Sequence, residues 1–183
     1  MPSSDPVTIP HVLKLVSALN PRSILDVGSG NGRYGFLFRE VLDLNHGRLP
    51  KTTWKTRIDS VEVDKSYLTD VHRYVYDKVF NIDWREFETS STYDLVFMGD
   101  VLEHFDDWQF ALEKAISMSW NVMVVSPNWN GSINQGAWHG HDHETHRVEL
   151  SPEMVGGKCV FANSKCFISC FGGGVFDQRD ILL

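Results

Sequence analysis

The sequence predicts an α/β protein built on a parallel sheet with helices on both faces. Apolar runs with strand character alternate with segments of helical period through the first 128 residues, and this alternation is typical of parallel sheets whose crossovers are helices. A cluster of glycines separates the first strand-like run from the helix that follows it. Because 183 residues can bury one sizeable core but hardly two, we expect residues 1–183 to form one domain.

The first three predicted elements are a helix, a strand and a second helix. Residues 7–20 place apolar side chains at helical spacing, and Pro10 falls near the first turn, where its missing N–H costs little. Residues 22–27, RSILDV, form an apolar run that predicts a buried strand. After the glycines, residues 33–44 resume a helical period.

The middle of the chain repeats this pattern. The alternation in residues 57–64, RIDSVEVD, predicts a second strand, and residues 66–79 have the period of a helix. Residues 79–83 predict a short third strand, and residues 93–100 predict a fourth. Residues 106–119 predict an amphipathic helix, which would cross from the fourth strand to the fifth.

The last third of the chain begins with a fifth predicted strand, residues 121–128, which ends near a proline. Residues 129–149 are polar and rich in His, Gly and Trp, and they are too many for an ordinary connection, so we interpret them as a site loop. The remainder from Lys158 has strand composition and predicts the last two strands.

Composition and charge exclude several classes of protein. The chain has 17 Lys and Arg against 24 Asp and Glu, a formal net charge of −7, which disfavours nucleic acid as a partner. Its three cysteines show no C-x-x-C spacing, which suits reduced thiols and not a structural zinc site. No segment has the composition of a signal peptide or a membrane span. We therefore expect a cytoplasmic protein with no membrane partner, whose oligomeric state stays open.

The glycine cluster, SILDVGSGNGRYG at residues 23–35, indicates a cofactor turn. A dinucleotide fingerprint G-x-G-x-x-G matches from Gly30, but in such a site the first glycine belongs at the turn leaving the strand, which here is Gly28. The frame that fits the strand is D-x-G-x-G-x-G, beginning at Asp26. The carboxylate of Asp26 would repel a pyrophosphate and would attract a cationic ligand. S-adenosyl-L-methionine carries a sulfonium, an ammonium and no phosphate.

Five segments in order extend this interpretation: ILDVGSGNG, VEVDKS, NIDW, YDLVFMGDVLEHFDDW and NVMVVSPN. With them the chain resembles the class I S-adenosylmethionine-dependent methyltransferases. The resemblance implies a three-layer Rossmann-like methyltransferase fold with a mostly parallel seven-stranded sheet and an antiparallel last strand. It implies methyl transfer to an O, N or C nucleophile of a small-molecule acceptor. The short segment SPEMVGG departs from the family, which usually has a full helix there.

The resemblance also implies which residues hold the methionine and ribose parts of the cofactor. Four residues match the positions that line its methionine end: Asp26, Gly28, Gly30 and Gly32. At these positions glycines let the backbone approach the cofactor, and the carboxylate balances its positive charge. Glu62, at the end of the second strand, matches the acid that accepts hydrogen bonds from both ribose hydroxyls.

Three further positions match the family's contacts to the rest of the cofactor. Asp83 matches the acid that accepts a hydrogen bond from the adenine amino group, and Trp84 would be an apolar or stacking neighbour. Asp100, just after the fourth strand, lies where family members contact the cofactor, often through the backbone. Asp64 is close to Glu62 but is more simply explained as a helix cap.

The segment AWHGHDHETHRVEL, residues 137–150, holds four histidines, at positions 139, 141, 143 and 146. It follows the fifth predicted strand, at the edge where α/β proteins bind ligands. A metal site, a solvated structural loop and a lid over the acceptor remain open, and we favour the lid, because several methyltransferases of this class have a similar HR pair at this place. We assign no metal.

On the lid interpretation Trp138, His139 and Arg147 contact the substrate, and His146 is a candidate base because imidazole titrates near neutral pH. His104, in the segment LEHF, is the second candidate catalytic residue. Its neighbour Glu103 is expected to be structural, since in the resembled family this stretch often shapes the start of a helix.

Two other functions share these features. An NAD-dependent oxidoreductase would use the same strand, glycine turn and ribose acid. A non-catalytic binding subunit with a methyltransferase-like fold would keep the sheet without turnover. The identity of the acceptor is not encoded in any of the motifs.

Overall fold

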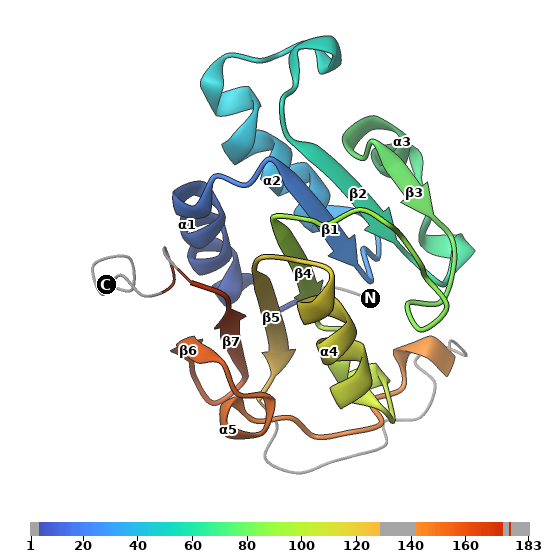
Figure 1. The fold of residues 1–183 in the computed structure, drawn as a ribbon, viewed down its shortest axis with the longest axis vertical. Coiled ribbons are helices and arrows are strands. Elements are labelled where there is room, and N and C mark those ends of the chain that lie inside the picture. Colours follow the sequence, from blue (N-terminus) through green and yellow to red (C-terminus); the bar gives the residue numbers. More distant parts are fainter. Residues whose placement is uncertain (1–3, 129–141, 174–175, 177–183) are drawn as a thin grey trace.

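A computed structural model describes residues 4–128, 142–173 and 176 of the chain. Within these residues seven strands form one sheet, in the order β3-β2-β1-β4-β5-β7-β6 (Figure 1). The strands are β1 Ser23–Val27, β2 Arg57–Val61, β3 Lys78–Phe80, β4 Leu95–Gly99, β5 Val122–Pro127, β6 Lys158–Ala162 and β7 Cys166–Phe171. The first five strands are parallel to one another, and β7 is antiparallel to both of its neighbours. The predicted sheet is thus confirmed.

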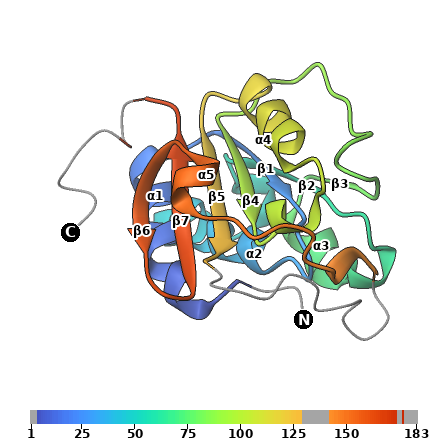
Figure 2. The same ribbon diagram turned by 90° about the horizontal axis from the view of Figure 1, so that it is seen from below.

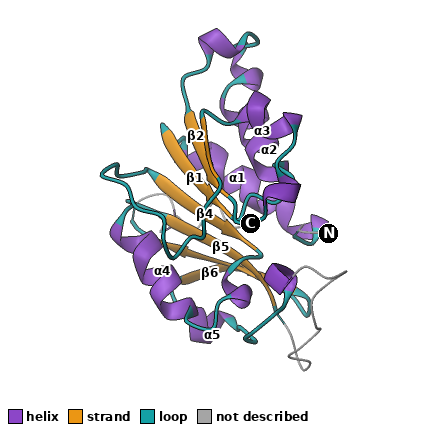
Figure 3. Ribbon diagram, turned by 90° about the vertical axis from the view of Figure 1, so that its right-hand side faces the viewer, coloured by secondary structure: helices purple, strands orange, loops and turns teal. Residues whose placement is uncertain are grey.

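Helices cover both faces of this sheet, as Figure 3 shows in profile. They are α1 Ile9–Leu19, α2 Arg33–Leu42, α3 Asp70–Val75, α4 Trp108–Ser117 and α5 Pro152–Val155. Side chains of β4 alternate between the two layers, with Val96 and Met98 packed in the cluster that holds α4 and α5. Leu95 and Phe97 pack in the cluster that holds α1, α2 and α3. This alternation divides the core into two halves, one on each side of the sheet.

The helix expected over residues 66–79 is wrong in extent, because only α3 is α-helical there, a 3₁₀ turn at Lys65–Tyr67 precedes it, and β3 already begins at Lys78. Thr69 caps the first turn of α3 with its side chain. Beyond the helix, Asp77 pairs with β2: its backbone N–H donates to the Ile58 carbonyl over 2.7 Å, and its carboxylate accepts from the Ile58 N–H over 2.8 Å. Tertiary pairing therefore ends the helix before its apolar period does.

The other predicted helices and strands are confirmed, and their boundaries differ from the prediction by at most three residues. The short segment after the site loop forms α5, a single turn capped by the side chain of Ser151. In the described part of the chain, no helix has both the length and the apolar character that crossing a bilayer requires.

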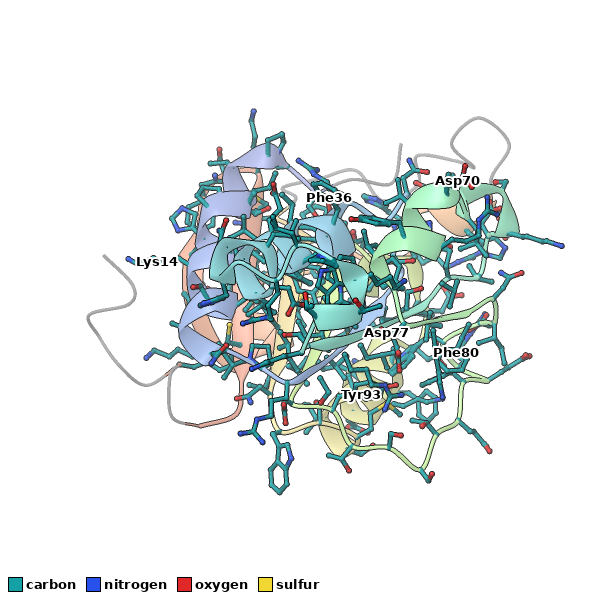
Figure 4. All side chains as sticks on the ribbon, turned by 90° about the horizontal axis from the view of Figure 1, so that it is seen from above. Lys14, Phe36, Asp70, Asp77, Phe80 and Tyr93 are labelled. Atoms are coloured by element: carbon teal, nitrogen blue, oxygen red, sulfur yellow. The ribbon has the colours of Figure 1, made fainter. Side chains whose placement is uncertain are left out.

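Replacing Phe38 with Ala should lower the free energy of unfolding by about 3–5 kcal/mol. Phe38 is fully buried on α2, 5.2 Å from the ring centre of Phe97 and 5.7 Å from that of Tyr34, so truncation opens a cavity. Phe36 lies two residues earlier on the same helix and is 42% exposed (Figure 4). Urea unfolding of Phe36→Ala is the control, expected to change stability by less than about 1 kcal/mol; equal losses in the two variants would contradict this packing.

Candidate functional site

A cavity of about 480 Å³ opens at the carboxyl ends of the parallel strands. Gly28 follows β1, Glu62 follows β2, Asp83 lies beyond β3 and Asp100 follows β4, and all four line this cavity. The segment 142–147 closes its other side. Figure 2, which views this edge of the sheet, shows that segment running across it toward α5. The strand order reverses between β1 and β4, which is where α/β sheets bind their ligands.

The turn after β1 requires glycine at its first position. Gly28 has a φ of +67°, and its N–H donates to the Val61 carbonyl over 2.8 Å. A Cβ at this position would lie 2.6 Å from a methyl carbon of Val101. Gly30 and Gly32 complete the turn, and neither lines the cavity. Of the predicted glycines, only Gly28 therefore presents its backbone to the cavity.

Glu62 connects this turn to the second strand. Glu62 is 5% exposed, and its carboxylate accepts hydrogen bonds from the N–H of Gly30, over 2.7 Å, and of Asp64, over 2.9 Å. Burial raises the pKa of Glu62 to about 7, and the two backbone donors only partly oppose this rise. Asp64 caps the short helix that follows, as expected, through a hydrogen bond from the N–H of Ser66.

Asp26 lies inside β1 and does not line the cavity. Its carboxylate accepts a 2.5 Å hydrogen bond from the hydroxyl of Tyr76, and burial raises its pKa to about 7 despite that bond. Tyr76 lies against Gly35, where a Cβ would meet the Tyr76 ring at 2.3 Å. Tyr76 was not among the residues predicted from the sequence. The available signal was Gly35, a glycine inside a helix that no turn explains.

The predicted adenine contacts have partners within the protein. Asp83 accepts two hydrogen bonds from the guanidinium of Arg85, over 3.0 and 2.6 Å, and this contact lowers the pKa of Asp83. Trp84 is 3% exposed, stacks with Phe87 and donates from its indole N–H to the Ala111 carbonyl over 3.1 Å. Trp84 therefore contributes one edge to the cavity wall and is otherwise a core residue between the sheet and α4.

Asp100 occupies the turn that leaves β4. Its φ is +51°, and its N–H donates to the Val125 carbonyl over 2.8 Å, so the backbone is held to the neighbouring strand. Burial raises the pKa of the carboxyl to about 7, although the nearby Ser4 side chain and the charge of Arg33 act in the opposite direction.

Glu103 and His104 belong to a single 3₁₀ turn, Leu102–His104, that follows β4. Glu103 lines the cavity and is 2% exposed, and burial raises its pKa well above the usual range of a carboxyl. Its Oε2 is 3.5 Å from the hydroxyl of Ser126, and its Oε1 has no hydrogen-bond partner among the described residues. Glu103 thus forms part of the cavity wall, a place that its sequence context did not indicate.

His104 and His146 meet from two distant segments. Their ring centres are 4.9 Å apart, with the ring planes nearly perpendicular. The Nδ1–H of His104 donates to the Thr145 carbonyl over 3.1 Å, and the N–H of Arg147 donates to the Glu103 carbonyl over 2.7 Å. Burial lowers the pKa of both imidazoles. The two predicted catalytic histidines are therefore brought together in the cavity wall.

The three predicted substrate contacts differ in outcome. Arg147 lines the cavity, and its guanidinium is 3.1 Å from the carboxylate of Asp142 and 3.7 Å from that of Asp106. Trp138 and His139 lie outside the described residues.

No family model and no curated protein matches the chain. Solved structures do. The N-terminal domain of EvdMO1 with S-adenosyl-L-homocysteine (SAH) bound has a TM-score of 0.59 at 14% identity, over 91% of this chain and 80% of that one. The N-methyltransferase NodS from Bradyrhizobium japonicum, also with SAH, has a TM-score of 0.56 at 15% identity, over 88% and 84%. The chain has the Rossmann-like methyltransferase fold.

The methyltransferase fold is shared with larger enzymes too. The plantazolicin methyltransferase BpumL, in complex with a monoazolic desmethylPZN analogue and SAH, has a TM-score of 0.51 at 17% identity. The match covers 67% of this chain and 48% of that chain, so the present chain spans about half the length of BpumL.

Replacing Asp26 with Asn should flatten the pH dependence of stability. The pKa of Asp26 is raised from 3.8 to about 7 on folding, so between these values the folded state keeps a proton that the unfolded chain has released. The stability from this group is full below the unfolded pKa and is lost as the pH rises through the folded one. Asp26→Asn should remove a slope of up to about 1 kcal/mol per pH unit between roughly pH 5 and 7, measured by urea unfolding.

Asp83→Asn is the control for this experiment. The pKa of Asp83 is lowered on folding, so its stability contribution changes only at more acidic pH. Its curve should run parallel to that of the parent over the same range. The parent and both variants contain the same histidines, so the histidine contribution to the pH dependence cancels when their curves are compared. Parallel curves for Asp26→Asn and the parent would contradict the raised pKa.

Proposed function

We propose that the protein binds S-adenosyl-L-methionine and transfers its methyl group to an O, N or C nucleophile of a small-molecule acceptor, releasing SAH. One observation carries the proposal. The glycine turn, Glu62 and Asp100 meet around one cavity at the strand-order reversal of a methyltransferase fold. Structures with this fold include EvdMO1, NodS and BpumL, each described with SAH bound.

The chemistry around the cavity suits a cationic cofactor. Glu62 and Asp100 line the cavity and Asp26 lies inside β1, just before the glycine turn; all three are buried carboxyls with raised pKa values. An ammonium or sulfonium group nearby would favour their charged forms. The backbone of Gly28 lets the methionine part approach the turn. Each carboxylate oxygen of Glu62 accepts one backbone hydrogen bond and has a second lone pair, so the ribose hydroxyls can add to the contacts already present.

The reaction requires little covalent work from the protein. A lone pair of the acceptor forms the new bond to the methyl carbon, the S–CH₃ bond breaks with its electron pair remaining on sulfur, and the acceptor releases its proton. Catalysis therefore rests on in-line positioning and on exclusion of water. His104 and His146 lie in the wall where an acceptor would release that proton.

Glu62→Gln should weaken SAH binding by about tenfold or more, because an amide accepts hydrogen bonds less strongly than a carboxylate and offers one oxygen in place of two. Isothermal titration calorimetry with SAH measures the affinity. Asp64→Asn is the matched control. Asp64 is two residues away and does not itself line the cavity, its side chain caps the short helix Lys65–Tyr67, and its replacement should leave the affinity within about threefold.

Two results with the parent protein would reject the proposed cofactor. One is the absence of SAH and S-adenosyl-L-methionine binding at millimolar ligand. The other is a rise in melting temperature with NADH and none with SAH, which would identify an oxidoreductase. A protein that binds SAH but forms no SAH from S-adenosyl-L-methionine, with any acceptor in a panel of hydroxyl- and amine-bearing compounds, would instead be a binding subunit.

His146→Ala should keep SAH affinity and lose turnover. The His146 imidazole lies at the acceptor end of the cavity, on the segment 142–147, apart from the glycine turn and Glu62. Turnover is measured as SAH release with the best acceptor of the panel, and the expected loss is about 100-fold or more. His46→Ala is the control, because His46 is exposed and outside the cavity. Equal turnover in His146→Ala and the parent would remove His146 from the site.

A further inference from the structure

Three metal-ligating side chains converge in the wall of the cavity. One ligand atom from each of Glu103, His104 and His146 lies within 4.8 Å of the other two. The Oε1 of Glu103 is 3.9 Å from the Nε2 of His104, and all three residues line the cavity. The first two residues follow β4 and the third follows β5, so the sheet brings the cluster together at the edge where ligands bind.

A hydrogen bond to the backbone orients the ring of His104. Its Nδ1 is 3.1 Å from the Thr145 carbonyl, and a carbonyl only accepts, so the proton is on Nδ1. The lone pair is therefore on Nε2, the atom that faces the carboxylate of Glu103. An imidazole that donates its other N–H to a backbone carbonyl is the usual arrangement behind a metal-bound histidine.

Glu103 supplies a second, independent observation. Its side chain is 2% exposed, and Oε1 has no hydrogen-bond partner among the described residues. Leaving a buried oxygen without a partner costs free energy, and structures normally provide a donor, a water or a cation. The other two members of this cluster are imidazoles, His104 and His146.

We propose that Glu103, His104 and His146 bind a divalent transition-metal cation whose remaining coordination positions open into the cavity. Two imidazoles and one carboxylate favour Zn²⁺, Mn²⁺, Fe²⁺ or Co²⁺ over Mg²⁺ and Ca²⁺, which take oxygen ligands. Tetrahedral ligands at about 2.1 Å from zinc are separated by about 3.4 Å, so side-chain rotations that bring the three ligand atoms roughly 1 Å closer complete the site. The backbone bond between Arg147 and Glu103 already holds the two segments together.

A metal site here indicates a hydroxyl-bearing acceptor. This inference rests on the proposed methyl transfer. An acceptor with a hydroxyl would occupy an open position on the cation, which lowers the pKa of that hydroxyl. Its proton passes to water, the oxygen lone pair forms the O–CH₃ bond, and the S–CH₃ bond breaks with its electron pair kept by sulfur. A coordinated imidazole has no lone pair for a proton, so His146 acts here as a ligand and not as the base.

The test uses the full chain after chelator treatment and dialysis. Titration with Zn²⁺ by calorimetry, and with Co²⁺ by visible absorption, should give one cation per chain. Glu103→Gln and His146→Ala should each lower the affinity by more than about tenfold, since each removes one of three ligands. His143→Ala is the matched control, because His143 lines the same cavity but is outside the cluster, and its affinity should match that of the parent.

SAH affinity, measured on every variant, separates misfolding from ligand loss. A variant that binds SAH normally and has lost Co²⁺ supports the site. Absence of Zn²⁺, Mn²⁺ and Co²⁺ binding by a parent protein that binds SAH would overturn the metal site and leave the proposed function intact. An equal loss of affinity in His143→Ala would overturn the assignment of ligands. A parent that binds metal but no SAH would instead contradict the proposed cofactor.

Discussion

β1 is hydrogen-bonded to β2 on one side and to β4 on the other, and it is parallel to both. This pairing determines where the groups of the cavity lie. Gly28, Glu62 and Asp100 are far apart in sequence, but each follows one of three adjacent strands, so their backbones arrive at the same edge. The N–H of Gly28 donates to the last residue of β2, which ties the turn itself to the pairing. The cavity is therefore a property of the sheet more than of any one loop.

Buried acids dominate the electrostatics of this edge. Asp26, Glu62, Asp100 and Glu103 all have pKa values raised by burial. Each is costly to ionise without a partner of opposite charge. Backbone donors and the Tyr76 hydroxyl compensate part of this cost. A cationic ligand would compensate more of it, and the proposed cofactor carries such a charge.

Local signals were enough to predict most of the fold, and together with the family resemblance they selected residues that the structure brings to one cavity, Gly28, Glu62, Asp83 and Asp100. The glycine turn and the acid that ends β2 are recognisable because the residues lie beside strand ends. Tyr76 could not be placed, since its contact with Asp26 joins residues fifty positions apart. The predicted extent of α3 was wrong for the same reason, because pairing of Asp77 with Ile58 overrides a local helical period.

The histidine-rich segment illustrates the same limit. Within it, no histidine could be chosen on spacing alone, and no metal was assigned. The proximity of His146 to Glu103 and His104 depends on how the chain returns across the sheet, which no local pattern encodes. Glu103 is expected to be structural because in the resembled family this stretch often shapes the start of a helix. Its burial beside a cavity became visible only in three dimensions.

The two walls of the cavity are built from different kinds of structure. The turn and the acids belong to paired strands, whereas the opposite wall is a segment attached to the 3₁₀ turn by bonds such as those from Arg147 to Glu103 and from His104 to Thr145. Substitutions and insertions in residues 142–147 would leave the strand pairing intact. The fold can therefore keep the strand-end half of the cavity constant during evolution while the other half diverges.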